Sequence, residues 1–217
     1  MVGSSTLKMT TRFSFLLLIA VLFIVTLTSA QNATSTPNAG GRASKMYYAI
    51  STLPVGEAKA SFRNASSNDK SELWRTHLAL SLVKRPELNE RQKRIILSAM
   101  SLATAEFFEV RSSDPAWKAK VREPLRSLEE QIANAFSRKD ALKIFATLSD
   151  DTESANCITT YPGSVLLKNI NYQRGPCGCS TDSDWCPISG YCSKTHCNPT
   201  QSGCGTLWSY PCNGDCR

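Results

Sequence analysis

The chain has 217 residues, with 25 Lys and Arg side chains against 18 Asp and Glu and a formal net charge of +7. No nucleic-acid recognition motif accompanies this basic excess, so we expect no nucleic-acid partner. The Gly-x-Ser-x-Gly, His-Glu-x-x-His and phosphate-loop motifs are also missing from the sequence. We therefore expect no enzyme, no catalytic residue, no cofactor and no metal site.

Residues 1–30 have the pattern of an export signal. Lys8 and Arg12 precede an apolar run, and small residues ending at Ala30 follow it. The run is shorter than the about 20 apolar residues that a membrane anchor needs, so we expect cleavage after Ala30. The mature protein is then secreted or periplasmic, in an oxidising compartment where cysteines form disulfides.

Residues 31–41 are rich in Asn, Thr, Ser, Gly and Pro and predict a flexible lead-in. Residues 42–148 follow, where apolar side chains recur at helical spacing and predict four or five helices around one core. The predicted fold class is an all-α helical region followed by a small disulfide-rich module. Because the helical region has no cysteine and has apolar faces of its own, we expect the two parts to fold independently.

Local signals place several helix boundaries. Asp69 predicts the start of a helix that Pro86 ends, and Asn89 with Gln92 predicts a capping box. His77 lies on the apolar face of its helix and is expected to be a hydrogen-bonded core histidine. One apolar face is predicted behind the capping box, formed by Ile96, Met100, Ala103 and Phe107.

Two prolines mark the next helical stretch. Asp114 followed by Pro115 predicts a helix start, and Pro124 predicts a kink or a break further along. A last short helix is expected near residues 141–148. The positive charge of the helical region is either a solvated surface or an attraction to an acidic envelope polymer.

Residues 149–174 are predicted to be a linker or connector. The chain has nine cysteines, so at least one thiol is free or joins two chains, and Cys157 in this linker is the candidate. Arg174 precedes Gly175 just before the cysteine cluster, and exposed small-residue segments are preferred cleavage sites. Arg174 is therefore a candidate processing site.

Residues 175–217 are too few to bury a sufficient core and are predicted to form a disulfide-stapled module. The opening Cys-x-Cys differs from the Cys-x-x-Cys spacing of zinc sites, which favours disulfides over a metal. Eight cysteines allow 105 pairings, so the connectivity stays open. The cysteines expected in bridges are Cys177, Cys179, Cys186, Cys192, Cys197, Cys204, Cys212 and Cys216.

The module contains four short motifs: C-x-C-S-T at 177–181, S-D-W-C-P-I at 183–188, G-C-G-T at 203–206 and C-N-G at 212–214. On these motifs the module resembles the exported bacterial proteins called bacteriocin fulvocin C-related, over about the last fifth of the chain. Pro211 stands where that pattern has a cysteine, and Cys216 appears later instead. The last bridge is therefore either rewired within the cluster or completed by Cys157.

The resemblance implies a bacteriocin-like protein whose C-terminal module carries antibacterial activity, with a bacterial envelope component or surface polymer as its partner. Residues 174–217 hold three basic and three acidic side chains, which argues against membrane disruption driven by charge. The alternative is a non-toxic extracellular binding or adhesion protein with a stapled interaction module.

Four aromatic residues of the module have two interpretations. They form either a binding patch for lipid headgroups or sugars, which would allow peripheral membrane contact, or the small core of the module itself. These residues are Trp185, Tyr191, Trp208 and Tyr210.

Overall fold

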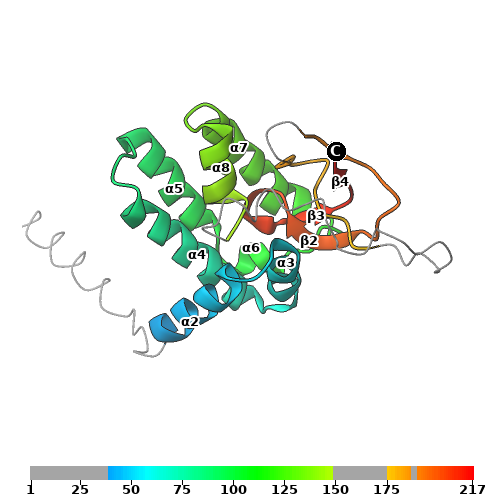
Figure 1. Ribbon diagram of the computed structural model, residues 1–217, viewed down its shortest axis with the longest axis horizontal. Coiled ribbons are helices and arrows are strands. Elements are labelled where there is room, and N and C mark those ends of the chain that lie inside the picture. The colour runs from blue at the N-terminus through cyan, green and yellow to red at the C-terminus, as the bar shows by residue number, and fades with distance from the viewer. Residues whose placement is uncertain (1–38, 149–174, 187–189) are drawn as a thin grey trace, which may run out of the picture. The chain divides into compact units, whose positions relative to one another are not determined.

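The computed structural model describes residues 39–148, 175–186 and 190–217 (Figure 1). The expected export signal, most of the lead-in, and the linker with Cys157 and Arg174 lie outside these residues. Within them, no helix combines the length and the apolar composition that crossing a membrane requires.

The first three helices are α2 (Ala39–Ser51), α3 (Val55–Asn64) and α4 (Ser67–Lys84). The predicted N-cap at Asp69 is wrong by nearly one helical turn, because the Ser66 side chain accepts the Asp69 N–H at 3.1 Å and is the N-cap. Asp69 instead places a negative charge in the first turn, where its interaction with the helix dipole is stabilising. Helix α4 ends before Pro86, as predicted.

Helix α5 (Glu90–Leu102) begins with the predicted capping box of Asn89 and Gln92, in which both reciprocal hydrogen bonds are present. The chain leaves the helix at Ala103 and begins α6 (Ala105–Glu109), with Thr104 as N-cap. The single predicted face is therefore divided between two helices. Ala103 and Phe107 are nevertheless both buried, as the spacing predicts.

The break expected at Pro124 is a π-helical turn, η1 (Lys118–Arg122), which leads into α7 (Glu123–Ala133). Proline has no N–H and its ring clashes with the helical carbonyl four residues earlier, and a π turn accommodates both effects. The Asp114 carboxylate accepts the Ala116 N–H at 2.7 Å and so caps the chain where the sequence predicts a helix start. Helix α8 (Arg138–Phe145) follows, capped by Ser137.

The C-terminal module contains four short strands in two antiparallel pairs. Strand β1 (Cys192–Ser193) pairs with β4 (Asp215–Cys216), and β2 (Thr200–Cys204) pairs with β3 (Tyr210–Cys212). A 3-10 turn, η2 (Thr206–Trp208), joins β2 to β3. The predicted fold class, helices followed by a small disulfide-rich module, is confirmed. The predicted number of four or five helices is too low, since the described residues contain seven α-helices.

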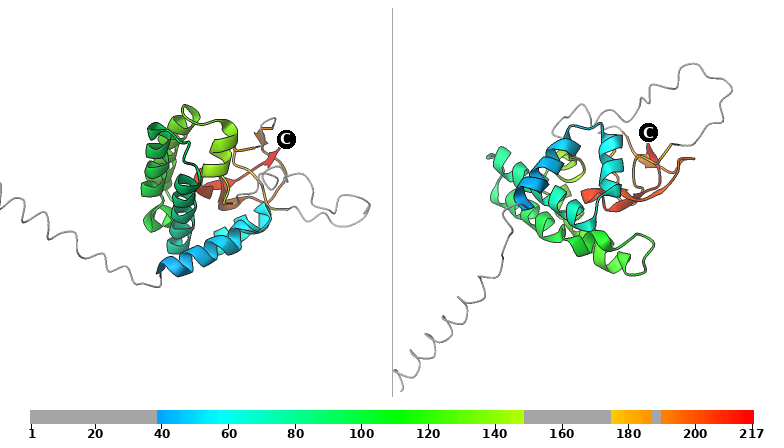
Figure 2. Two further views of the ribbon diagram at one scale, coloured as in Figure 1. Left: turned by 60° about the vertical axis from the view of Figure 1, so that its left-hand side comes forward. Right: turned by 90° about the horizontal axis from the view of Figure 1, so that it is seen from below.

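The expectation that the two parts have separate cores is wrong. Trp208 from the module is 1% exposed and packs edge-on against Phe62 of α3 and Trp74 of α4, with ring centroids 5.4 and 5.8 Å apart. Its indole Nε1 donates to the Ala146 carbonyl at 2.8 Å. Tyr210 packs in the same way against Trp117, and β2 lies beside α3 (Figures 1 and 2). One hydrophobic cluster therefore includes side chains from the helices and from the module.

The shared core predicts that Trp208→Ala destabilises the helices as well as the module. Replacing a buried tryptophan by alanine removes its contacts and leaves a cavity, which costs about 3–5 kcal/mol. We expect the helical circular dichroism to melt at a lower temperature. Tyr191→Ala is the control, because Tyr191 is an aromatic residue of the same module that is 62% exposed, and its loss should change stability by at most ~0.5 kcal/mol. Equal melting curves for the two variants would contradict a shared core.

Candidate functional site

The candidate site is the cysteine-rich module together with the helical surface on which it rests. All eight cysteines of the cluster are oxidised in pairs with one another, as the sequence predicts, and Cys157 lies outside the described residues. Cross-links of this density restrict the unfolded chain and hold a module that has little core of its own. The bridges are Cys177–Cys197, Cys179–Cys192, Cys186–Cys216 and Cys204–Cys212.

The pairing decides whether the last bridge is rewired within the cluster or completed by Cys157, the question raised by Pro211. Cys216 is joined to Cys186, within the cluster, so the last bridge does not use Cys157. Pro211 lies in the middle of β3, between two buried residues. The cysteine displaced toward the C-terminus thus closes the longest loop of the module, with a sequence separation of 30.

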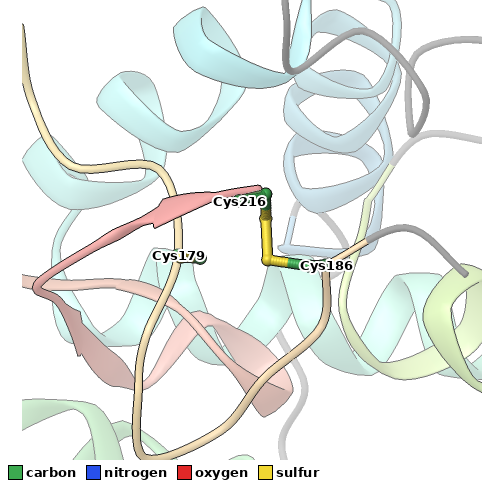
Figure 3. A group of neighbouring side chains, drawn as sticks. All are labelled: Cys179, Cys186 and Cys216. Atoms are coloured by element: carbon green, nitrogen blue, oxygen red, sulfur yellow. A yellow bond between two sulfur atoms is a disulfide. The ribbon is translucent and has the colours of Figure 1, made fainter. Parts of the chain in front are cut away.

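Three sulfur atoms lie within 4.8 Å of one another, those of Cys179, Cys186 and Cys216. Figure 3 shows Cys186 joined to Cys216, with Cys179 beside them. Cys179 is itself bonded to Cys192. Metals bind thiolates, so a metal ion at this cluster would require both bridges to be reduced. The close approach reflects the packing of two neighbouring disulfides.

The turn between β2 and β3 presents two large side chains to the helices. Leu207 and Trp208 have φ values of 54° and 50°, in the left-handed region that costs a bulky residue about 1–3 kcal/mol. Gly205 before them has φ 69°, and a Cβ there would lie 2.4 Å from the Tyr210 ring. Leu207 and Trp208 are buried among the helices, and this burial stabilises the strained turn.

The four module aromatics do not form one surface patch. Trp208 and Tyr210 are 1% and 0% exposed, so for these two residues the binding-patch interpretation is wrong. They belong to the shared core because the helices supply the apolar partners that the module lacks. Trp185 is half-buried and its Nε1 donates to Thr206 Oγ1 at 2.9 Å. Tyr191 is exposed and is the remaining aromatic available for surface contact.

A half-buried carboxylate of α7, that of Glu129, accepts hydrogen bonds from the module. Glu129 Oε1 accepts from Ser183 Oγ and Thr206 Oγ1, each at 2.6 Å, and Oε2 accepts from the Tyr210 hydroxyl at 3.3 Å. The two small hydroxyls in turn accept N–H bonds, Ser183 from the Thr206 backbone and Thr206 from the Trp185 ring. The hydroxyls of Ser183, Thr206 and Tyr210 therefore all donate to Glu129, and these hydrogen bonds fix the position of the module on α7.

Burial raises the pKa of Glu129 above its usual value of 4.5, and the three hydrogen bonds oppose this shift. Burial, and then the neighbouring charge of Glu129, also raises the pKa of the Tyr210 hydroxyl far above its ordinary value. Tyr210 therefore remains a hydrogen-bond donor over the whole physiological pH range.

Cations of the helical region contact the module around this carboxylate. Lys59 Nζ donates to the Gly178 carbonyl at 2.8 Å, and burial, with Arg63 nearby, lowers its pKa from 10.5 to about 8. Arg122 pairs with Asp182 at 3.2 Å. Arg138 pairs with Asp184 at 3.7 Å and donates to the Cys186 carbonyl. The contacts place basic helical residues opposite acidic residues and carbonyls of the module.

Glu129 and Lys59 were not predicted as contact residues, although the spacing of their apolar neighbours offers a signal for both. Glu129 lies four residues after Leu125 and three before Ile132, which are both buried. Lys59 lies three residues before the buried Phe62. A charged residue on an apolar face is a candidate for a buried contact, but neither residue was singled out from the sequence.

His77 has the role that the sequence predicts for it. It is 2% exposed, its Nδ1 lies 3.0 Å from the Tyr47 hydroxyl, and its Nε2 lies 3.1 Å from the Lys143 carbonyl. A carbonyl oxygen only accepts, so Nε2 carries the proton and donates. His77 thus joins α2, α4 and α8 inside the core.

The comparison with known proteins finds one curated relative in the C-terminal region that holds the cysteine cluster. Over 41 residues, or 18% of this chain, the sequence is 54% identical to bacteriocin fulvocin-C of Myxococcus fulvus, and the match spans 91% of that protein. No family model matches the chain, and no solved structure matches it. The resemblance predicted from the cysteine motifs is confirmed.

The raised pKa of Glu129 predicts how stability depends on pH. The folded state holds the proton more tightly than the unfolded state, so this contribution is full below pH 4.5 and is lost as the pH rises through the raised pKa. Glu129→Gln has no titrating group but keeps an oxygen that accepts from Ser183 and Thr206. We expect the natural chain to lose more stability than this variant between about pH 4 and about pH 7.

Urea unfolding midpoints at the two pH values measure this difference. Glu130→Gln is the matched control, because Glu130 is the exposed neighbour of Glu129 and should leave the pH profile unchanged. Glu129→Leu should lower stability at both pH values by ~1–3 kcal/mol, because it leaves buried hydroxyls without an acceptor. Parallel pH profiles for the natural chain and Glu129→Gln would rule out this role of Glu129.

Proposed function

The chain belongs, through its C-terminal segment, to the family of bacteriocin fulvocin-C, and from this membership we propose that its disulfide-rich module carries antibacterial activity. The observation that carries the proposal is the extent of the match. The 41 matched residues make up 91% of the relative, so this module corresponds to nearly the whole of that bacteriocin. The homologue and the four disulfides indicate an extracellular protein.

The helical region has no counterpart in that relative, and we assign it the role of a cover. It surrounds Leu207, Trp208 and Tyr210, which are buried in the shared core. A module separated from the helices would expose these apolar side chains. Exposed aromatic and aliphatic residues with a polar rim are typical of surfaces that bind proteins or membranes. The covered face is therefore the face proposed to act on bacteria.

Activation then requires two steps. Cleavage in the linker, for which Arg174 is the candidate, cuts the chain before the first bridge. The cut module still holds Trp208 in the helical core and keeps its hydrogen bonds to Glu129. Cleavage alone therefore leaves the module in place, and activity follows its dissociation.

The proposed partner is a specific component of the bacterial envelope or a surface polymer. Residues 174–217 hold three basic and three acidic side chains, so the module lacks the cationic charge that attracts simple membrane-disrupting peptides to anionic lipid. Peripheral membrane contact would depend on the apolar face after release. Export through the segment ending at Ala30 completes the proposal.

A non-toxic binding or adhesion protein is the second candidate, and the shared core favours it. Two of the module's four aromatic residues are part of the core that stabilises the helices in the intact chain, as expected for a module with a permanent structural role. Under this alternative the module never separates from the helices.

The decisive test compares growth inhibition by three preparations over a broad panel of bacteria. These are the intact chain, the chain cut in the linker but still associated, and the oxidised module of residues 175–217 with its four bridges verified. We expect inhibition by the oxidised module and little by the other two preparations. The reduced and alkylated module is the control and should be inactive, because the bridges hold its fold.

Equal inactivity of the intact chain and the oxidised module across the panel would refute the antibacterial proposal and favour the binding protein. Equal killing by the intact chain would refute the covering role of the helices, while leaving the antibacterial role in place.

A further inference from the structure

A pocket of about 470 Å³ lies where α3, α4 and α6 meet strand β2 of the module. Its volume falls within the range of about 300–1,000 Å³ that is typical of small-molecule sites. Three cationic side chains line it, Arg63, Lys70 and Arg111, against one carboxylate, the exposed Glu109. None of the three residues that donate to Glu129 lines this pocket, so the pocket is separate from the Glu129 network.

The three cations have no anionic partner in the part of the chain that the structure describes. The ion pairs there join other residues, such as Arg122 with Asp182 and Arg138 with Asp184. Unlike those two arginines, the pocket cations form no ion pair that compensates their charge.

Contacts with the surrounding protein hold two of these cations in place. The Arg63 side chain lies across Gly203 of β2, where an added Cβ would come within 3.2 Å of the guanidinium. Gly203 has φ 108°, a conformation that favours glycine. The Lys70 ammonium lies 5.5 Å from the centroid of the Phe62 ring, in a cation–π contact. Burial lowers the pKa of both Arg63 and Lys70, so an anion would relieve an electrostatic cost.

Hydroxyl groups from both parts of the chain complete the lining. Ser67 is the first residue of α4, Ser202 lies in β2, and Ser209 follows the η2 turn. Phe107 and Val121 form part of an apolar wall. The pocket thus offers several cationic donors, neutral donors and an apolar surface to one ligand.

We propose that this pocket binds a phosphate-bearing ligand and that the ligand joins the helical region to the module. A phosphate group carries up to two negative charges and several acceptor oxygens. It therefore suits a site with three cations better than a ligand with a single carboxylate would. The apolar wall accommodates the rest of the ligand. Two sources have this chemistry, a soluble phosphorylated compound and the headgroup of an anionic phospholipid.

Calorimetric titration of the full-length chain with inorganic pyrophosphate tests the site. We expect saturable binding that the double variant Lys70→Gln/Arg111→Gln weakens by about tenfold or more, since each charge-assisted contact contributes strongly. Arg91→Gln is the control, because Arg91 is an exposed arginine of α5 that is not part of the pocket lining. Circular dichroism melting of each variant confirms that it is folded.

A co-sedimentation assay separates the two sources of phosphate. Vesicles of phosphatidylglycerol are compared with vesicles of phosphatidylcholine, with and without pyrophosphate as competitor. Sedimentation with phosphatidylglycerol that pyrophosphate reverses identifies a lipid headgroup, and pyrophosphate binding without sedimentation identifies a soluble ligand. Failure of both probes to bind overturns the proposal, as does equal weakening by Arg91→Gln, which would show attraction to the general surface charge. Neither assay measures killing, so its result is independent of the antibacterial proposal.

Discussion

The insertion of Trp208 into the helical core is the interaction on which the rest of the structure depends. A module of about forty residues with four disulfides has little apolar interior, and its bridges restrict the chain without supplying a core. The helices supply that interior, with Phe62 and Trp74 around the indole ring. The cost of the left-handed backbone at Leu207 and Trp208 is offset by this burial.

The same insertion connects the structure with the proposed function. The side chains that stabilise the intact chain are also those that a released module would expose. The polar contacts around them are directional, since Glu129 accepts three hydrogen bonds and Lys59 donates to the Gly178 carbonyl. Such contacts specify one orientation of the module on the helices. A covering role for the helical region therefore needs no element beyond the contacts that already hold the fold together.

Local signals in the sequence predicted much of the fold, whereas long-range contacts could not be predicted. The capping box at Asn89 and the break before Pro124 depend on neighbouring residues and were correctly expected. The eight cluster cysteines were identified by composition, but their pairing depends on three-dimensional proximity. The burial of Trp208 was not decided, because an aromatic residue in a small module suits a binding surface and a core equally well. Glu129 was missed for a similar reason, since its hydrogen-bond donors lie 54 to 81 residues away.

The central claim is that the module and the helices form one cooperative structure. Hydrogen–deuterium exchange of the full-length chain, before and after reduction of the disulfides, tests it most directly. The account predicts that reduction removes protection from the amides of α3 and α4, which contact Trp208, together with those of β2 and β3. Loss of protection in the module while α3 and α4 remain as protected as in the oxidised chain would contradict it.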